Sequence, residues 1–317
     1  MQADSTLAAT TGNRRTDAAL RALIATCQRA LPQRLRSAYI TGSYADGTGL
    51  ATSDLDATLV FTGSLTADER AAVGDALARE GARSAQVELD LAVADERDLA
   101  AGVTPMLKLA ARCVWGRDDR AEMPLIAVER WARERMHAAY WLLVNIFERP
   151  LPLQTPLTFP REHDEFRGYT QRTVRLEDGS DAPCTRDLLR VTGWAATALV
   201  ARRGGYVARK RESAAAYRER VGDEHAALLD DLSRWCREQW AYLIPAAAAD
   251  RARLREMCAR TLAFERRFLT EYRDWALGEL QSGDAEARHA AACMLGRVPL
   301  ADSALTDALA LAEAGSS

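Results

Sequence analysis

Lysine is almost absent from this chain. Of the 42 lysine and arginine residues in its 317 positions, only Lys108 and Lys210 are lysines. The formal net charge at pH 7 is −3, so the chain lacks the overall positive field that is typical of proteins that bind long nucleic acids. We therefore expect a small substrate, and a lysine in a motif stands out against a background of arginine.

Cysteine and histidine are also sparse, and neither shows metal-binding spacing. The six cysteines form no Cys-x-x-Cys pair, and the four histidines have no zinc-type spacing. Most of the cysteines lie among apolar residues, as buried thiols of cytosolic proteins do. No apolar run is long enough to span a bilayer, and residues 1–16 lack the apolar core of a signal peptide. We expect a cytoplasmic protein without a membrane partner, in which residues 1–16 form a disordered arm.

Hydrophobic spacing in the first part of the chain predicts helices and strands in alternation. Apolar residues recur at helical intervals over 17–31 and again over 67–79. Short apolar stretches at 38–41 and 55–61, and an alternating stretch at 84–93, are typical of strands. This order of elements suits a small mixed β-sheet backed by helices.

The second part of the chain shows mainly helical patterns. A long helix is expected at 125–147, and another at 249–279, where apolar residues recur at three- and four-residue steps. A short hairpin is expected around 173–176. The predicted fold class is therefore α+β, with a sheet-containing domain over 17–150 followed by an all-α helical bundle domain over 151–317.

The most informative motif is a Gly-Ser turn followed by two alternating aspartates. Gly42 and Ser43 follow the strand at 38–41, and Asp54 and Asp56 alternate at the start of the next strand. Side chains two apart on a strand share a face, which sets these Cα atoms roughly 6–7 Å apart. Two like charges repel unless a cation lies between them, and Mg²⁺ prefers one or two carboxylates plus phosphate oxygens. The motif predicts magnesium held against a nucleoside triphosphate.

Two more acids alternate on the strand at 84–93. Apolar residues occupy every second position from Val87 to Val93, and Glu88 and Asp90 lie between them. Both carboxylates therefore share the polar face of that strand. Either one could face the aspartate pair.

These motifs resemble the nucleotidyltransferase (DNA polymerase β-like) superfamily, whose signature is Gly-Ser or Gly-Gly, a spacer and Asp-x-Asp. The segment from Val87 to Val93 looks like the Val-Glu-Val-Thr-Ile-Val-Val strand of the streptomycin/spectinomycin adenylyltransferases, where the glutamate is the general base. That match implies Glu88 as the base, while Asp90 replaces the family's threonine. Other branches carry a metal-binding aspartate that Asp90 could match, so the choice between the two acids stays open.

A second likeness lies far downstream. The segment from Gly205 to Tyr217 is similar to Gly-Lys-Ile-(Val/Ala)-Pro-Lys-Asp-Val-Ala-Ala-Asp-Trp in the helical domain of the same enzymes. The second lysine of that segment reaches the nucleotide phosphates and falls on Lys210; a compact ammonium suits phosphate. The acid that contacts the cationic antibiotic in those enzymes falls on Cys184 or Thr185, which leaves the acceptor open.

The resemblance implies a Mg²⁺-dependent nucleotidyltransferase. It would move AMP from ATP, or another NMP from its NTP, to a hydroxyl of a small molecule such as an aminoglycoside-like antibiotic, and release pyrophosphate. The implied catalytic residues are Asp54, Asp56 and Glu88, and the implied ligands of two Mg²⁺ ions are Asp54, Asp56 and Asp90. The implied nucleotide-binding residues are Gly42, Ser43, Ser53 and Lys210. The helical domain over 151–317 would help to bind nucleotide and acceptor.

Two alternatives remain open. A tRNA- or RNA-directed nucleotidyltransferase, for example a toxin, uses the same acids but needs a clustered basic groove, for which only Arg202-Arg203 and 209–211 are candidates. A nucleotide-binding regulator without catalytic activity would not need Asp54, Asp56 and a third acid intact.

Overall fold

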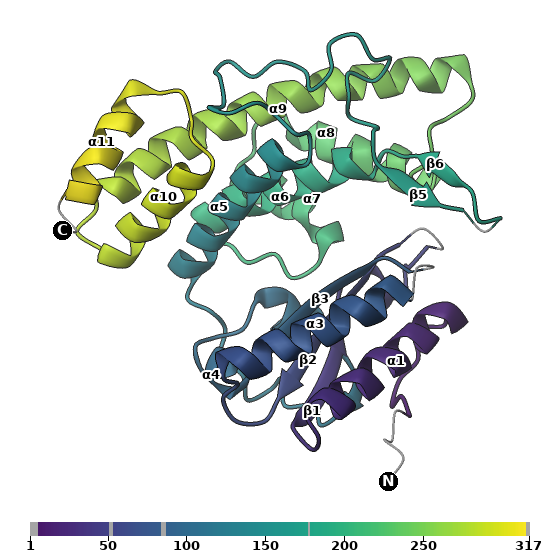
Figure 1. Ribbon diagram of the computed structural model, residues 1–317. Coiled ribbons are helices and arrows are strands. Elements are labelled where there is room, and N and C mark those ends of the chain that lie inside the picture. Colours follow the sequence, from purple (N-terminus) through teal and green to yellow (C-terminus); the bar gives the residue numbers. More distant parts are fainter. Residues whose placement is uncertain (1–5, 51–52, 84–86, 177, 315–317) are drawn as a thin grey trace. The chain divides into compact units, whose positions relative to one another are not determined.

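The chain divides into two compact units. The computed structural model describes four stretches of the chain, namely residues 6–50, 53–83, 87–176 and 178–314. The first unit comprises the described residues of 1–127 and of 175–180, together with Ala208–Lys210. The second unit comprises the remaining described residues from Val128 onward (Figure 1). The division falls after Ala127 because the helix that begins at Val128 belongs to the second unit, whereas the sequence pattern placed the boundary at residue 150.

The first unit is built on a mixed sheet of four strands in the order β3-β2-β1-β4. The strands are β1 (Leu35–Ile40), β2 (Leu55–Phe61), β3 (Leu89–Ala94) and β4 (Arg112–Gly116). β1 pairs antiparallel with β2 and β4, and β2 pairs parallel with β3. The expected small mixed sheet is confirmed, although the sequence pattern does not predict β4. β3 begins later than expected, and residues 84–86 lie outside the described residues.

Helices cover both faces of this sheet. α1 (Arg14–Ala30) and α3 (Ala67–Arg83) lie side by side on one face, where their apolar residues share a core with alternate residues of β1 and β2 (Figure 1). On the other face, α4 (Glu96–Ala100) and the π-helical turn η1 (Met106–Ala110) pack against Tyr39 of β1. The very short α2 (Gly42–Ala45) follows β1 directly.

The segment before α1 differs from the expected disordered arm over 1–16. The side chain of Asn13 accepts hydrogen bonds from the backbone N–H groups of Arg15 and Thr16, which caps α1. The backbone N–H of Ala8 donates to the carbonyl oxygen of Val114 at 2.8 Å. The described residues of this segment, from residue 6 on, are therefore tied to the first unit, and residues 1–5 lie outside the described part.

The second unit is largely helical, as the sequence predicts. Its α-helices are α5 (Val128–Asn145), α6 (Arg186–Arg202), α7 (Ser213–Arg220), α8 (Ala226–Asp231), α9 (Ala248–Leu280), α10 (Ala285–Arg297) and α11 (Ser303–Ala314). The shorter elements that follow α5 in the chain are the 3₁₀ turn η2 (Lys210–Glu212), the π-helical η3 (Leu232–Gln239), and the strands β5 (Thr173–Arg175) and β6 (Asp181–Pro183). Of these, Arg175 and Lys210 belong to the first unit. The expected hairpin is confirmed because β5 pairs with β6.

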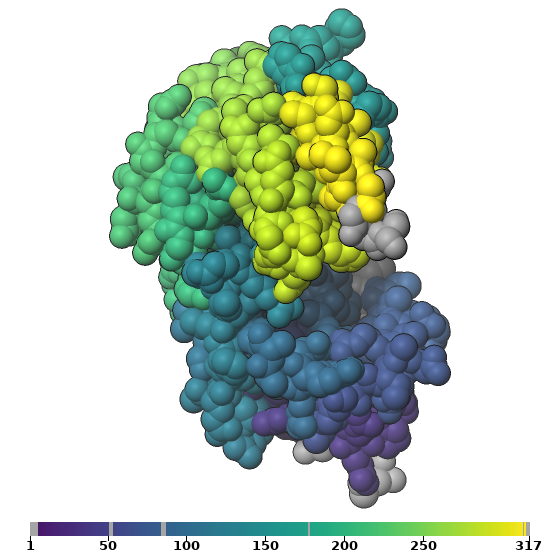
Figure 2. Space-filling view, turned by 90° about the vertical axis from the view of Figure 1, so that its left-hand side faces the viewer, coloured from purple at the N-terminus to yellow at the C-terminus, as the bar shows by residue number. Residues whose placement is uncertain are grey.

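Aromatic residues of α5 and α9 form part of the core of the second unit. Tyr140 stacks on Tyr272 with ring centroids 4.1 Å apart, and both rings are buried. α10 and α11 pack on α9 and on each other, and Figure 2 shows them on the surface of this unit. Among the described residues, none of the helices combines the length and apolar character needed to cross a bilayer.

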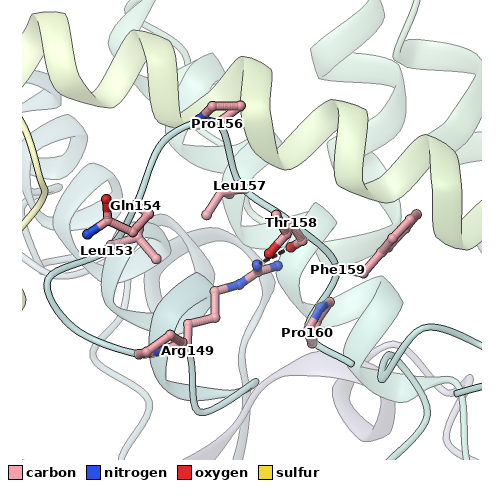
Figure 3. A pocket seen from close by; sticks show the side chains of 9 residues that line it. Arg149, Leu153, Gln154, Pro156, Leu157, Thr158, Phe159 and Pro160 are labelled. Carbon is pink, nitrogen blue, oxygen red and sulfur yellow. Dashed lines mark hydrogen bonds between the residues drawn. The ribbon is translucent and has the colours of Figure 1, made fainter. Parts of the chain in front are cut away.

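The second unit also holds a pocket of about 390 Å³, lined by residues of the segment 149–160 (Figure 3). The guanidinium of Arg149 donates to the carbonyl oxygen of Thr158 and to Glu265, each at 2.7 Å. The hydroxyl of Tyr169 donates to the same carboxylate at 2.6 Å. Since Arg149 and Glu265 are both buried, this network ties the segment to α9.

Candidate functional site

Strand pairing in the first unit brings Asp56 beside a second acid and beside the Gly-Ser turn. β2 lies between β1 and β3, and the Cα register pairs Asp56 with Asp90. Paired residues on neighbouring strands point to the same face of a sheet. On the other side, the backbone N–H of Thr41 donates to the carbonyl oxygen of Asp56 at 3.0 Å. Asp56 thus lies between the third acid and the turn at Gly42.

Asp54 and Glu88 occupy the equivalent positions just before the two strands. The backbone N–H of Leu55 donates to the carbonyl oxygen of Glu88 at 2.8 Å. Extending the β2–β3 register by one residue therefore sets Asp54 beside Glu88, although neither residue lies within its strand. Asp54 is half-buried and Glu88 is exposed.

Gly42 lies directly against the carboxylate of Asp56. Its φ of +66° is in the left-handed region that favours glycine. A Cβ at this position would overlap Oδ2 of Asp56 and lie 3.3 Å from its Cγ. Only glycine leaves room for this carboxylate beside the turn.

Lys210 brings a positive charge to the acids from far along the sequence. Its Nζ lies 3.4 Å from Oδ2 of Asp56, within hydrogen-bond reach. The neighbouring Arg209 donates from Nε to Oδ1 of Asp46 at 2.9 Å. The segment Ala208–Lys210 belongs to the first unit, so both contacts lie within that unit.

The environment of Asp56 disfavours its charged form. Burial raises the pKa of Asp56 to about 6, and the charges of Asp54 and Asp90 add to the rise, while Lys210 opposes it. Burial by itself would lower the pKa of Lys210. The negative charges of Asp56 and Asp54 raise it by more, so the pKa of Lys210 lies above its usual value. The pKa shifts and the strand register therefore lead to the same arrangement: the carboxylates of Asp54, Asp56 and Asp90 lie near one another, and the ammonium of Lys210 lies beside them.

The two serines expected to bind nucleotide lie on either side of the loop after the turn. Ser43 is half-buried in α2, and its carbonyl oxygen accepts from the backbone N–H of Thr48 at 2.9 Å. Ser53 is buried, and its hydroxyl oxygen accepts from the backbone N–H of Leu50 at 2.9 Å. The contact of Ser53 shapes the loop before β2, which is a structural role that the sequence motif does not suggest.

The acids fit magnesium better than they fit a metal held by protein alone. Among the residues that the structure describes, no group of three or more His, Cys, Asp or Glu side chains is positioned to hold a metal ion. Mg²⁺, however, takes only one or two carboxylates and completes its shell with phosphate oxygens and water. The pair Asp54 and Asp56 supplies oxygen donors of the right kind, and Lys210 shows that a cation is accepted at Asp56.

The structure adds the ion pair of Arg209 with Asp46, which no spacing in the sequence indicates. It also assigns partners to two of the other arginines considered for a nucleic-acid groove. Arg202 and Arg203 both donate to Glu271, each at 3.1 Å. Because these arginines are paired with acids, they present less positive charge than the sequence alone indicates.

No protein-family model and no curated protein sequence matches this chain. Among solved structures, the chain is similar to the crystal structure of spectinomycin adenyltransferase AAD(9) from Enterococcus faecialis with ATP and spectinomycin. The sequence identity is 15%, the match covers 77% of this chain and 98% of that chain, and the TM-score is 0.44. A likeness at this level does not assign an activity.

Proposed function

We propose that this chain is a Mg²⁺-dependent nucleotidyltransferase that moves AMP from ATP to a hydroxyl of a small molecule and releases pyrophosphate. One observation carries the proposal. Asp56 pairs in register with Asp90, lies against Gly42, and has the ammonium of Lys210 at 3.4 Å. Clustered acids beside a glycine turn and a lysine are suited to a metal–triphosphate complex, because the carboxylates can bind the metal ions and the ammonium can bind the phosphates.

Asp54 and Asp56 would hold two Mg²⁺ ions, and Asp90, which pairs with Asp56 on the neighbouring strand, would add a third carboxylate to the site. When bound, the ions would neutralise the triphosphate and lower the pKa of the acceptor hydroxyl. The position of the negative charge is fixed by the strands, because β2 and β3 are paired over six residues of register. This pairing supports a rigid rather than an adaptable site.

The turn and Lys210 would hold the triphosphate. Gly42 has no side chain, which lets the Asp56 carboxylate lie against the turn, and the amide and hydroxyl of Ser43 would donate to phosphate oxygens. Ser53 would add a donor through its hydroxyl hydrogen, because among the described residues its hydroxyl only accepts a hydrogen bond, from the backbone N–H of Leu50. Lys210 would move from Asp56 to the phosphates, over a short distance that its flexible stem allows.

Glu88 would act as the general base. It is exposed, whereas Asp56 is 15% exposed and in contact with Lys210, so Glu88 is the more accessible of these two acids to an incoming acceptor. The acceptor oxygen would attack the α-phosphorus, its proton would pass to the carboxylate of Glu88, and the bond from the α-phosphorus to the bridging oxygen would break. Pyrophosphate then leaves with that electron pair.

A small, hydroxyl-rich acceptor suits the charge distribution better than RNA does. Arg202, Arg203 and Arg209 are paired with acids, whereas the catalytic face carries Asp54, Asp56, Glu88 and Asp90. These acids would serve either kind of acceptor, but with the three arginines paired less positive charge remains to hold the phosphates of RNA, and the acidic side chains attract a cationic molecule. An aminoglycoside-like antibiotic, cationic and rich in hydroxyls, is the acceptor class that we propose.

The test is transfer of label from [α-³²P]ATP, with Mg²⁺, to a panel of aminocyclitols, aminoglycosides, simple alcohols and tRNA. We expect label on a small molecule, with pyrophosphate released in equal amount. Asp54→Asn and Asp56→Asn should abolish transfer, while Glu88→Gln should abolish transfer but still bind Mg·ATP. Label on tRNA alone, or transfer that survives Asp56→Asn, would contradict the proposal.

A further inference from the structure

Arg209 precedes Lys210 in the chain and makes a shorter contact with the first unit than Lys210 does. Nε of Arg209 donates to Oδ1 of Asp46 at 2.9 Å, which is a normal length for a hydrogen bond between charged groups. Nζ of Lys210 lies 3.4 Å from Oδ2 of Asp56, beyond the usual range of 2.7–3.2 Å. The side chain of Asp46 is only 10% exposed, and solvent screens a partly buried ion pair less than an exposed one. Of these two cations, Arg209 therefore has the stronger contact.

Asp46 is itself fixed to the Gly42 turn. It follows α2 directly, and its backbone N–H donates to the carbonyl oxygen of Gly42 at 3.1 Å. Gly42 lies against the carboxylate of Asp56, which Lys210 contacts. The contacts therefore form a closed ring that runs from Asp46 through Gly42, Asp56, Lys210 and Arg209 back to Asp46. Such mutual support restricts the positions that each side chain can take.

The ion pair of Arg209 also limits where Lys210 can lie. Consecutive Cα atoms are about 3.8 Å apart, so holding Arg209 on Asp46 keeps the backbone of Lys210 near the turn. Without that restraint the flexible lysine stem would spread the ammonium over many positions, and ordering it would weaken phosphate binding. We propose that Asp46 and Arg209 are positioning residues, whose ion pair holds Ala208–Lys210 beside the turn and so keeps the ammonium of Lys210 within reach of the phosphates. This inference rests on the proposed function, which assigns Lys210 to the triphosphate.

The scarcity of lysine allows a test that needs no nucleotide. Lys108 and Lys210 are the only lysines, so acetylation by an N-hydroxysuccinimide ester, followed by mass spectrometry of peptides, reports on each separately. Lys108 is an internal reference, because its Nζ donates to two backbone carbonyl oxygens within the first unit. In EDTA, we expect Arg209→Gln and Asp46→Asn each to speed the acetylation of Lys210 about two- to fivefold, as the loss of one such ion pair predicts. The rate at Lys108 should stay the same, which also shows that each variant is folded.

A matched control removes an arginine from an ion pair elsewhere in the first unit. Arg34 pairs with Glu69 at 3.0 Å, and its side chain is 33% exposed, against 31% for Arg209. Arg34 precedes β1, whereas the Gly42 turn follows that strand. Arg34→Gln therefore removes the same charge at the other end of β1 and should leave the acetylation of Lys210 unchanged.

Calorimetric titration with Mg²⁺ and a non-hydrolysable ATP analogue separates positioning from direct contact. Arg209→Gln should weaken binding about two- to fivefold in the unmodified chain but cause no further loss in Lys210→Met, because an effect that passes through Lys210 disappears with its ammonium. An equal loss in both backgrounds would overturn the positioning role, and so would acetylation of Lys210 that is the same in all variants. If the unmodified chain binds no nucleotide, the proposed function is contradicted, and the acetylation rates still show whether the ion pair holds Lys210.

Discussion

Replacing Gly42 by alanine tests the contact between the turn and Asp56. Alanine at a φ of +66° is strained by about 1–2 kcal/mol, because left-handed backbone crowds a Cβ. In addition, the new Cβ would overlap Oδ2 of Asp56. Relieving such an overlap in a packed site costs a further amount of about 1–3 kcal/mol. We expect Gly42→Ala to lower the free energy of unfolding by about 2–5 kcal/mol and to displace the Asp56 carboxylate.

Gly47 provides a matched control. Its φ is +69°, but a Cβ there would have no atom within 4 Å. Gly47→Ala should therefore show only the backbone strain, about 1–2 kcal/mol. The difference between the two variants measures the contact with Asp56.

Urea unfolding in EDTA gives both free energies, and titration with Mg²⁺ and a non-hydrolysable ATP analogue gives the effect on binding. We expect Gly47→Ala to bind like the unmodified chain and Gly42→Ala to bind at least about tenfold more weakly, since 1.4 kcal/mol is a factor of ten. If both variants lose the same stability and both bind equally well, then Asp56 does not lie against the turn.

Three further predictions concern charged and titratable groups. Burial lowers the pKa of His137 to about 4, so as the pH falls this histidine is protonated in the unfolded chain before it is protonated in the folded one. The free energy of unfolding should therefore fall by about 3 kcal/mol between pH 6.5 and pH 4. In urea unfolding, His137→Asn should flatten that pH dependence. Lys210→Met should weaken Mg·ATP binding at least about tenfold in calorimetry, and equal affinity would remove Lys210 from the phosphate site. A double-mutant cycle of Asp46→Asn and Arg209→Gln should give a coupling free energy of about 0.5–1 kcal/mol in urea unfolding. Zero coupling would mean that this ion pair does not help to hold the segment Ala208–Lys210 on the first unit.

Local periodicity predicted the elements that depend on it. The alternation of Asp54 and Asp56 with apolar residues identified β2, because a strand repeats every two residues. The spacing over 249–279 identified α9, whose observed range is Ala248–Leu280. Both signals are contained within one element, so no tertiary information is needed to read them.

Elements that depend on pairing were harder to predict. β4 has only five residues and is defined by its ladder with β1, a long-range contact. The start of β3 at Leu89 follows from its register with β2, so Glu88 lies just outside the strand although it fits the alternating pattern. The same register, rather than the alternation, pairs Asp90 with Asp56.

Tertiary ion pairs had no sequence signal. Asp46 and Arg209 are far apart in the chain, and nothing in their spacing indicates a contact at 2.9 Å. The sequence also predicted the wrong state for residues 6–16, since a polar composition favours disorder but does not show that Asn13 caps α1.

We propose that the acids beside the Gly42 turn bind a metal–nucleotide complex. Calorimetric titration with a non-hydrolysable ATP analogue, with Mg²⁺ and then with EDTA, tests it on the unmodified chain and on Asp56→Asn. We predict binding by the unmodified chain that requires Mg²⁺ and that falls at least about tenfold in Asp56→Asn. Binding that is the same with EDTA, or the same in Asp56→Asn, would show that these acids do not hold a metal–nucleotide complex.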